Sequence, residues 1–166
     1  IKGVFVTEDI KKNHLGKKLA LSLGIKAAKN EVLLLTDADC RPQSQSWIKA
    51  MVYPYTQNPK IEVVLGYSPF FKQSKLVNLV ARMENIYTGL NYLGFALRQN
   101  SYMGVGRNLS YKKSIFFRNK GFSAHNNIPG GDDDLLVNAA ANGKNTKVNI
   151  NKDSFVLTKP VENWSQ

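Results

Sequence analysis

The sequence is short of cysteine, of histidine and of long apolar runs, and each shortage narrows the classes of protein that fit. One cysteine, Cys40, among 166 residues excludes a framework of internal disulfides. The two histidines, His14 and His125, lack the spacing of a zinc site. No apolar run reaches the roughly 18 to 20 residues of a membrane-spanning helix. Neither a Gly-x-x-x-x-Gly-Lys-Ser/Thr loop nor a Gly-x-Gly-x-x-Gly motif is present, so the common glycine-rich nucleotide-binding loops are excluded.

Acidic residues are also scarce, and this makes their grouping informative. The chain has 12 Asp and Glu against 23 Lys and Arg, and its net charge of +11 indicates an anionic partner. Nucleic acid, acidic lipid and diphosphate-bearing substrates are all anionic partners of this kind. Five carboxylates nevertheless lie in two clusters. Because carboxylates repel one another and rarely crowd without a cation or a chemical task, we interpret both clusters as functional. They are Asp37 with Asp39, and Asp132 with Asp133 and Asp134.

The composition is that of one folded globular domain. Hydrophobic residues make up 43% of the chain and charged residues 21%, and 166 residues are enough to bury a core. We therefore expect a single domain over residues 1–166. The chain starts without Met inside a segment, 1–7, that is typical of a strand. We expect a fragment of a longer protein.

Apolar periodicity predicts an α/β fold. The segment 14–29 has an amphipathic helical pattern through Leu15, Leu19, Leu23 and Ala27. The apolar run 32–35 follows at once and is expected to be a strand buried on both faces, as in a parallel sheet. Further helices are predicted over 47–53, 75–97, 112–117 and 132–141, and further strands over 61–67, 146–150 and 154–157.

The longest periodic segment, 75–97, has nine large apolar residues at helical spacing. We expect this helix to pack into the core, and its lying on a membrane surface is the alternative. The nine residues are Leu76, Leu79, Val80, Met83, Ile86, Tyr87, Leu90, Leu93 and Leu97.

The first carboxylate pair follows the predicted strand 32–35. Residues two apart in extended backbone point to the same side, so Asp37 and Asp39 are expected to face one ligand. Ligands of open α/β sheets bind at the carboxyl ends of the strands. Two hard oxygen ligands suit Mg²⁺ or Mn²⁺ shared with phosphate oxygens. The alternative is a structural turn in which an Asp side chain bonds its own backbone.

The second cluster, Asp132 to Asp134, follows two glycines and opens a predicted helix. Asp at a helix start is favourable, so Asp132 is a candidate N-cap. Mutual repulsion is expected to raise the pKa of at least one carboxyl, which suits a general base. We predict catalytic roles for Asp133 and Asp132, with Asp133 facing the substrate.

Three basic residues are candidates for binding an anionic ligand. Lys17 and Lys18 stand at the start of the predicted helix 14–29, where they either approach a diphosphate or are solvated, and the sequence leaves both interpretations open. Arg107 lies in an apolar, glycine-bearing segment, 102–111. A buried arginine needs a partner, and a carboxylate cluster or a phosphate would supply one.

Four segments in this order resemble glycosyltransferase family 2, the inverting enzymes of the GT-A fold. They are 16–25, the helix before the metal motif; 32–39, the strand ending in Asp-x-Asp; 104–111, the acceptor-side segment; and 131–135, the catalytic-base motif. The resemblance implies a mixed, mainly parallel sheet flanked by helices. It also implies truncation at both ends, because the family's N-terminal nucleotide-binding strand and helix are nearly all missing and its Gln/Arg-x-x-Arg-Trp motif would lie just beyond Trp164.

The resemblance further implies the chemistry and the setting. The donor would be a UDP- or GDP-sugar bound with Mn²⁺ or Mg²⁺. Asp39 would be the chief metal ligand, and Asp37 would support the metal or contact the nucleotide. Asp133 would take a proton from an acceptor hydroxyl, giving an inverted linkage. The acceptor would be a glycan or a lipid-linked molecule. The location would be cytoplasmic, at the inner face of the cell membrane through segments absent from this chain. Lys17, Lys18 and Arg107 would help to bind the donor.

Two other functions remain as alternatives. A nucleotidyltransferase-like sugar-nucleotide enzyme also places carboxylates and a metal after a parallel strand, but it would need a glycine-rich phosphate loop. A non-catalytic basic module would bind nucleic acid or an anionic membrane. Nucleic-acid binding is disfavoured because the aromatic residues fall inside apolar periodic segments and not among the lysines.

Overall fold

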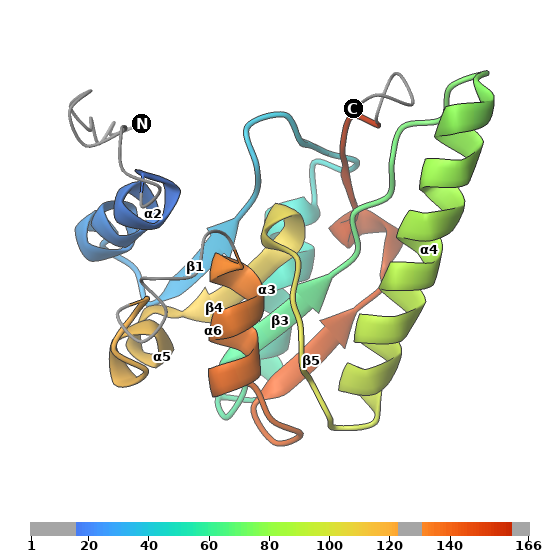
Figure 1. Ribbon diagram of the computed structural model, residues 1–166. Coiled ribbons are helices and arrows are strands. Elements are labelled where there is room, and N and C mark those ends of the chain that lie inside the picture. The colour runs from blue at the N-terminus through green and yellow to red at the C-terminus, as the bar shows by residue number, and fades with distance from the viewer. Residues whose placement is uncertain (1–15, 123–130, 161–166) are drawn as a thin grey trace.

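The computed structural model describes residues 16–122 and 131–160, and its centre is a four-stranded mixed sheet of order β1-β4-β3-β5 (Figure 1). β4 is antiparallel to both of its neighbours, β1 and β3, whereas β3 and β5 are parallel. Three of the four strands therefore run in one direction. This is the mixed α/β, GT-A-like architecture that the sequence predicts. The strands are β1 (Val32–Leu35), β3 (Val63–Gly66), β4 (Leu109–Lys112) and β5 (Thr146–Asn149).

Helices cover both faces of this sheet. The side chains of β3 alternate between the two cores that lie on these faces. Val63 and Leu65 belong to a core shared with α2, α4, α5 and α6, whereas Val64 belongs to a second core under α3. Such alternation is what a strand between two helical layers requires. The helices are α2 (Gly16–Ala27), α3 (Trp47–Gln57), α4 (Leu76–Leu97), α5 (Lys113–Arg118) and α6 (Asp132–Ala140).

Short elements complete the described part of the chain. β2 (Arg41–Pro42) pairs antiparallel with β6 (Val156–Leu157), and η1 (Gly106–Asn108) and η3 (Lys152–Ser154) are single 3₁₀ turns. The predicted strand over 1–7 and both histidines lie outside the described residues. In the part that is described, no helix is long and apolar enough to cross a membrane.

The predicted helix over 47–53 continues to Gln57, through Pro54. Proline lacks the N–H that would bond to the carbonyl four residues earlier, which is that of Ala50. Here the side-chain amide of Asn149 donates to the Ala50 carbonyl at 2.8 Å. Because β5 supplies the missing donor, α3 passes through the proline.

The prediction that 32–35 is buried on both faces was wrong. β1 lies at one edge of the described sheet, is half-buried along its length, and pairs antiparallel with β4. Its side chains still divide between the two cores, Leu33 toward one and Leu34 toward the other. The continuous apolar run therefore indicated correctly that both faces of this strand contact a core. It did not indicate the partial exposure that comes with a position at the edge of the sheet.

The face that α2 buries also differs from the prediction. Leu21 and Ile25 pack into the core, whereas Leu23 is half-buried and Ala27 is exposed. Apolar residues occur on nearly every side of this helix, so their spacing does not specify which side faces the sheet.

The predicted burial of the helix over 75–97 was wrong for most of its apolar residues. Of the nine large apolar side chains in the pattern, only Leu93 is buried. The buried side of α4 instead uses smaller residues, among them Gly89 and Ala96. A Cβ at Gly89 would lie 2.6 Å from the ring of Tyr67, so this close packing against the sheet requires glycine.

The capping role predicted for Asp132 was also wrong. α6 begins at Asp132 itself, and Gly131 is the N-cap with a φ of 69°. This left-handed conformation favours glycine. Asp133 and Asp134 thus lie in the first turn of the helix.

Candidate functional site

The topology brings two chain segments to one edge of the sheet. β1 and β4 are antiparallel, and Leu35 pairs with Leu109, so the residues after β1 lie beside the residues before β4. The first group holds the Asp37–Asp39 pair, and the second is the turn η1. Because β3 and β5 run in the same direction as β1, this edge is also where those strands end. It is the edge at which ligands of α/β sheets bind.

The Asp37–Asp39 pair lies in a turn and not in extended backbone as predicted. The Cys40 N–H donates to the Asp37 carbonyl at 3.1 Å. The turn nevertheless gathers the side chains, because ligand atoms of Asp37, Asp39 and Cys40 all lie within 4.8 Å of one another. The two carboxylates converge, although by a different local geometry.

The chemistry of this group fits a hard divalent cation. Burial raises the pKa of the Cys40 thiol, and the charges of Asp39 and Asp37 act in the same direction. A thiol is a soft ligand, so the two carboxylates are the groups of this cluster that suit a hard cation. The half-buried Asp37 and the exposed Asp39 offer two carboxylate oxygens of the kind that suits Mg²⁺ or Mn²⁺.

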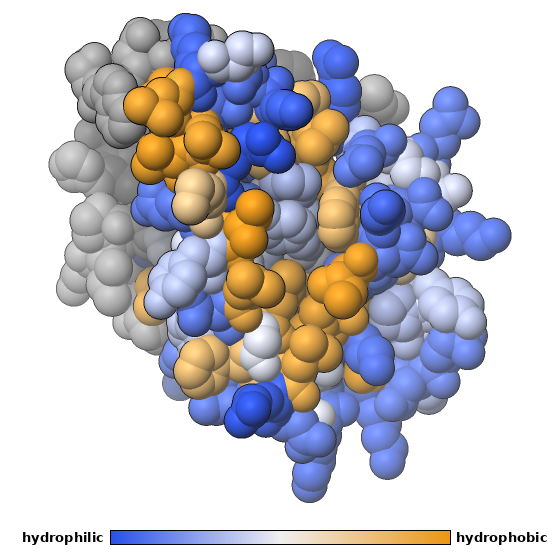
Figure 2. All heavy atoms as spheres, turned by 90° about the vertical axis from the view of Figure 1, so that its right-hand side faces the viewer, coloured by the Kyte–Doolittle hydropathy of each residue, from blue (hydrophilic) through white to orange (hydrophobic). Residues whose placement is uncertain are grey.

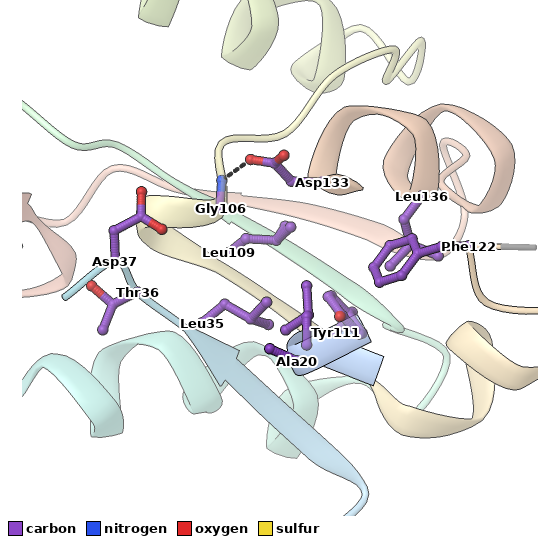
Figure 3. A pocket seen from close by; sticks show the side chains of 11 residues that line it. Ala20, Leu35, Thr36, Asp37, Gly106, Leu109, Tyr111, Phe122, Asp133 and Leu136 are labelled. Carbon is purple, nitrogen blue, oxygen red and sulfur yellow. Dashed lines mark hydrogen bonds between the residues drawn. The ribbon is translucent and has the colours of Figure 1, made fainter. Parts of the chain in front are cut away.

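Asp133 reaches the same edge from the first turn of α6. Its Oδ2 accepts a hydrogen bond from the backbone N–H of Gly106 in η1 (Figure 3). A Cβ at Gly106 would lie 2.8 Å from that oxygen. The absence of a side chain at Gly106 is therefore what lets the carboxylate approach the backbone.

Asp37 and Asp133 line one cavity of about 230 Å³. Figure 3 shows the two carboxylates toward one end of it, while Phe122 and Leu136 lie at the other. The remaining lining is largely apolar and comes from α2, β1 and β4. Charges interact more strongly beside such walls than in open water. The cavity thus joins one residue of each carboxylate cluster: a candidate metal ligand and a candidate base.

Asp39 lines a second cavity, of about 470 Å³. Arg41 and Lys159 also line it, together with Phe71 and Gln73. Sequence reasoning missed both cations as site residues. Arg41 follows the carboxylate pair directly and could have been found from that position, whereas Lys159 is far along the chain and joins the cavity only through the fold.

The raised pKa predicted for the second cluster occurs at Asp134. Burial raises the pKa of the Asp134 carboxyl, and the charge of Asp133 raises it further. The predicted rise of at least one pKa through repulsion is confirmed, and burial, which the sequence did not reveal, is its larger cause. Asp134 Oδ1 is buried without a hydrogen-bond partner among the described residues. Asp134 does not line the cavity that Asp133 lines.

The basic candidates have different surroundings. Lys18 is only 5% exposed, so the interpretation of a solvated side chain is wrong for it. Arg107 is half-buried with its guanidinium 5.4 Å from the centre of the Phe70 ring, and in the described part of the chain it meets no carboxylate. A cation over a ring is a favourable contact. The side chains of Lys17 and Asp132 lie outside what the structure describes.

Asn108 organises the site and was also missed. Its Oδ1 accepts from Trp47 Nε1 at 3.1 Å, and its Nδ2 donates to the carbonyls of Tyr67 and Ser154 at 2.9 and 2.7 Å. A Cβ at Gly66 would lie 2.3 Å from that nitrogen. This fully buried amide fixes η1, and η1 in turn holds Asp133 through Gly106. In the sequence, this role of Asn108 is indicated by its position directly after Gly106 and Arg107.

Comparison with known proteins adds one finding. The model of the family described as glycosyl transferase family 2 matches residues 8–120, which include the Asp37–Asp39 pair and Arg107 but not Asp133. No match was found among curated proteins.

Proposed function

Since the chain belongs to glycosyl transferase family 2 and is therefore a glycosyltransferase domain, we propose that it transfers a sugar from a UDP- or GDP-sugar to an acceptor hydroxyl with inversion. The family implies a nucleotide-sugar donor and an acceptor. The observation that carries the finer proposal is the cavity that Asp37 and Asp133 line together. It offers a place where the diphosphate end of a donor and an incoming hydroxyl meet.

Asp37 and Asp39 would hold Mn²⁺ or Mg²⁺ beside the donor diphosphate. Their convergence within 4.8 Å supports this assignment. When bound, such an ion neutralises the charge that grows on the departing nucleoside diphosphate. Asp37 would also contact the donor directly, since it lines the same cavity as Asp133, whereas Asp39 lines the second cavity.

Asp133 would act as the general base. The acceptor oxygen loses its proton to the Asp133 carboxylate as it forms a bond to the anomeric carbon. The bond from that carbon to the diphosphate oxygen breaks on the opposite side, and the electron pair leaves with the nucleoside diphosphate. A single displacement of this kind inverts the anomeric configuration. The Gly106 N–H keeps the carboxylate oriented toward the cavity.

The basic residues would complete the donor site. Lys17 and Lys18 open α2, and the next turn of that helix contributes Ala20 and Leu21 to the cavity. Arg107 follows Gly106, which also lines it. We assign all three to the donor diphosphate. The acceptor is a glycan or a lipid-linked hydroxyl compound.

Replacing the proposed base tests this function. In Asp133→Asn, turnover is expected to fall about 10²- to 10⁴-fold, because the amide cannot accept the proton. Donor affinity should stay unchanged, because Asp37 and Asp39 are intact. Release of nucleoside diphosphate from a set of UDP- and GDP-sugars, in the presence of Mn²⁺, measures turnover, and calorimetry measures affinity.

The matched control is Asp153→Asn, an exposed carboxylate of η3 that lines neither cavity. It should retain full turnover. Normal turnover in Asp133→Asn would remove Asp133 from the mechanism, and loss of donor affinity in the same variant would assign it to binding instead.

A further inference from the structure

One side of α4 is an apolar surface that no described element covers. Eight large side chains on it are 44 to 70% exposed. At 3.6 residues per turn they fall on one side of the helix. Figure 2 views the molecule from the side on which α4 lies in Figure 1, and the hydrophobic residues gather there. We call this surface the α4 stripe; its members are Leu76, Leu79, Val80, Met83, Ile86, Tyr87, Leu90 and Leu97.

The opposite side of α4 holds the helix in this orientation. Tyr92 is 2% exposed, and its hydroxyl donates to the Gly66 carbonyl at 2.7 Å. The fully buried Asn78 accepts from the Gln73 N–H at 2.8 Å and donates to the Phe71 carbonyl at 3.0 Å. Turning the stripe inward would break these bonds. These bonds therefore fix the orientation of α4 relative to the sheet.

The charged residues near the stripe are mainly basic. None of its eight members is charged, whereas Lys72 and Lys75 precede the helix, Arg98 follows it, and Arg82 lies within it. Glu84 is the single acidic residue of α4. An apolar face bordered by basic residues matches the boundary between acyl chains and anionic headgroups.

We propose that the α4 stripe docks the protein onto an anionic lipid membrane surface. The helix would lie in the plane of the surface, with its apolar side chains among the acyl chains and its basic neighbours against the headgroups. The net charge of +11 would add a longer-range attraction. This proposal rests on α4 alone and does not depend on the proposed transfer reaction.

The same charges argue against a second copy of the chain as the occupant. In an antiparallel pair of α4 helices, Lys75 of one copy would meet Arg98 of the other. In a parallel pair, each basic residue would meet its own counterpart. Either pairing sets cations against cations with only Glu84 to offset them, and like charges across an interface are unfavourable.

Docking would also set the position of the candidate site relative to the lipid. Phe71 and Gln73, which are tied to the first turns of α4 through Asn78, line the cavity that contains Asp39. A membrane under α4 would therefore lie next to that cavity.

Vesicle flotation of the whole chain tests the proposal. The probes are vesicles of phosphatidylcholine alone and of phosphatidylcholine with phosphatidylglycerol. We expect binding to the anionic vesicles, little binding to the neutral ones, and weakening by added salt. Replacing Leu79, Met83 and Leu90 together by Ser should weaken binding at least about tenfold, because three inserted apolar side chains are lost.

A matched variant and a charge variant make the test specific. Replacing Ile48, Tyr53 and Ile150 by Ser changes three side chains outside α4 that are 57 to 63% exposed, and should leave binding unchanged. Changing Lys72 and Arg98 to Glu should weaken binding to anionic vesicles several-fold. Circular dichroism confirms that each variant folds.

Two outcomes would overturn the proposal. One is equal flotation of the α4 variant and the matched control. The other is a dimer in sedimentation without lipid that the α4 variant abolishes, together with no flotation, which would assign the stripe to a second copy.

Discussion

At Gly106, a missing side chain determines how closely the proposed base is held. The Gly106 N–H donates to Asp133, and a Cβ there would lie 2.8 Å from the carboxylate oxygen and 3.3 Å from its carbon. Gly106→Ala is therefore expected to displace the Asp133 carboxylate. Turnover should fall while donor affinity, which depends on Asp37 and Asp39, is retained. Nucleoside diphosphate release and calorimetry on the same preparation separate the two effects.

Gly24→Ala is the control for this substitution. Apart from its chain neighbours and the backbone of α2, no atom lies within 4 Å of a Cβ at Gly24, which is inside that helix. Alanine should raise the free energy of unfolding by up to about 1 kcal/mol through helix propensity, with turnover unchanged. Equal turnover in Gly106→Ala and Gly24→Ala would show that the contact between Gly106 and Asp133 has no part in catalysis.

Single residues also show how far the site could be read from the sequence. Asp37, Asp39 and Asp133 could be proposed from the sequence because carboxylates stand out in a basic chain and have a recognisable spacing. Asn108 and Lys159 could not, since an amide or a lysine has no such contrast. What makes them important is packing between segments far apart in the chain, as when the side chain of Asn108 meets Trp47 and Ser154.

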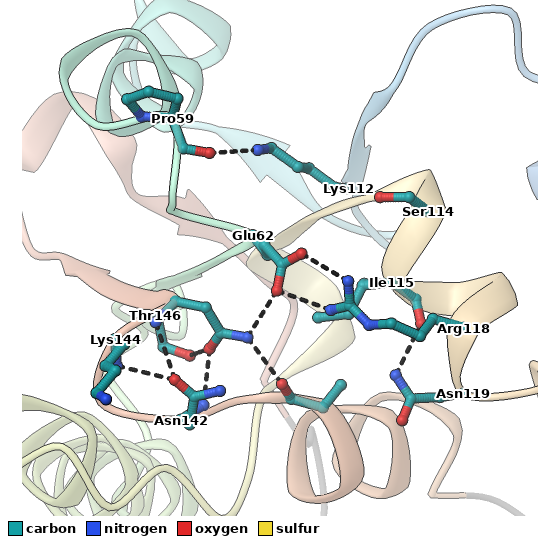
Figure 4. Close-up of polar contacts among 12 residues, drawn as sticks. Pro59, Glu62, Lys112, Ser114, Ile115, Arg118, Asn119, Asn142, Lys144 and Thr146 are labelled. Carbon is teal, nitrogen blue, oxygen red and sulfur yellow. Dashed lines mark hydrogen bonds and ion pairs between the residues drawn. The ribbon is translucent and has the colours of Figure 1, made fainter.

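Among the elements, β3, α5 and the turn before β5 are joined by one carboxylate (Figure 4). Arg118 of α5 contacts Glu62 through both of its terminal nitrogens at 2.9 and 2.8 Å, and Asn145 donates to the same side chain at 2.9 Å. These bonds hold the pKa of Glu62 below its usual value of 4.5, with Arg118 as the largest cause. Folding therefore favours the charged form of Glu62.

Stability should depend on pH through this carboxylate. A pKa that is lower in the folded state contributes stability that is present above the unfolded pKa and is lost as pH falls through the folded one. At neutral pH, Glu62→Gln should lower the free energy of unfolding by about 1 kcal/mol, a modest value because Arg118 is 56% exposed. The difference from the unsubstituted chain should shrink as pH falls below 4.5. Urea unfolding at several pH values measures it, and a difference independent of pH would contradict this account.

The elements were predicted better than their surroundings. Helices α4, α5 and α6 were expected within a residue or two of their observed bounds, because periodicity and glycine stops are local signals. The exposure of α4 and the edge position of β1 were not predicted, since both depend on which elements the tertiary fold places beside them. An apolar pattern shows that a side chain avoids water, but it does not identify what covers it.

For the whole molecule, the antiparallel strand β4 is the arrangement that builds the site. Because it enters the sheet at the edge where β1 leaves, the turn before it faces the turn after β1. α6 then brings Asp133 to the same place. The mixed sheet was foreseen through the family resemblance. Which strand was reversed was not, since short apolar strands have the same pattern in either direction.

The central claim is that Asp37 and Asp39 hold a divalent ion together with a donor diphosphate. Electron paramagnetic resonance of free Mn²⁺, titrated with the protein in the presence and absence of UDP, tests it most directly. The account predicts that UDP tightens Mn²⁺ binding to the unsubstituted chain and to Asp153→Asn, and that Asp39→Asn weakens that binding at least about tenfold, because one of two charged ligands is lost. Equal Mn²⁺ binding by Asp39→Asn and the unsubstituted chain would contradict it.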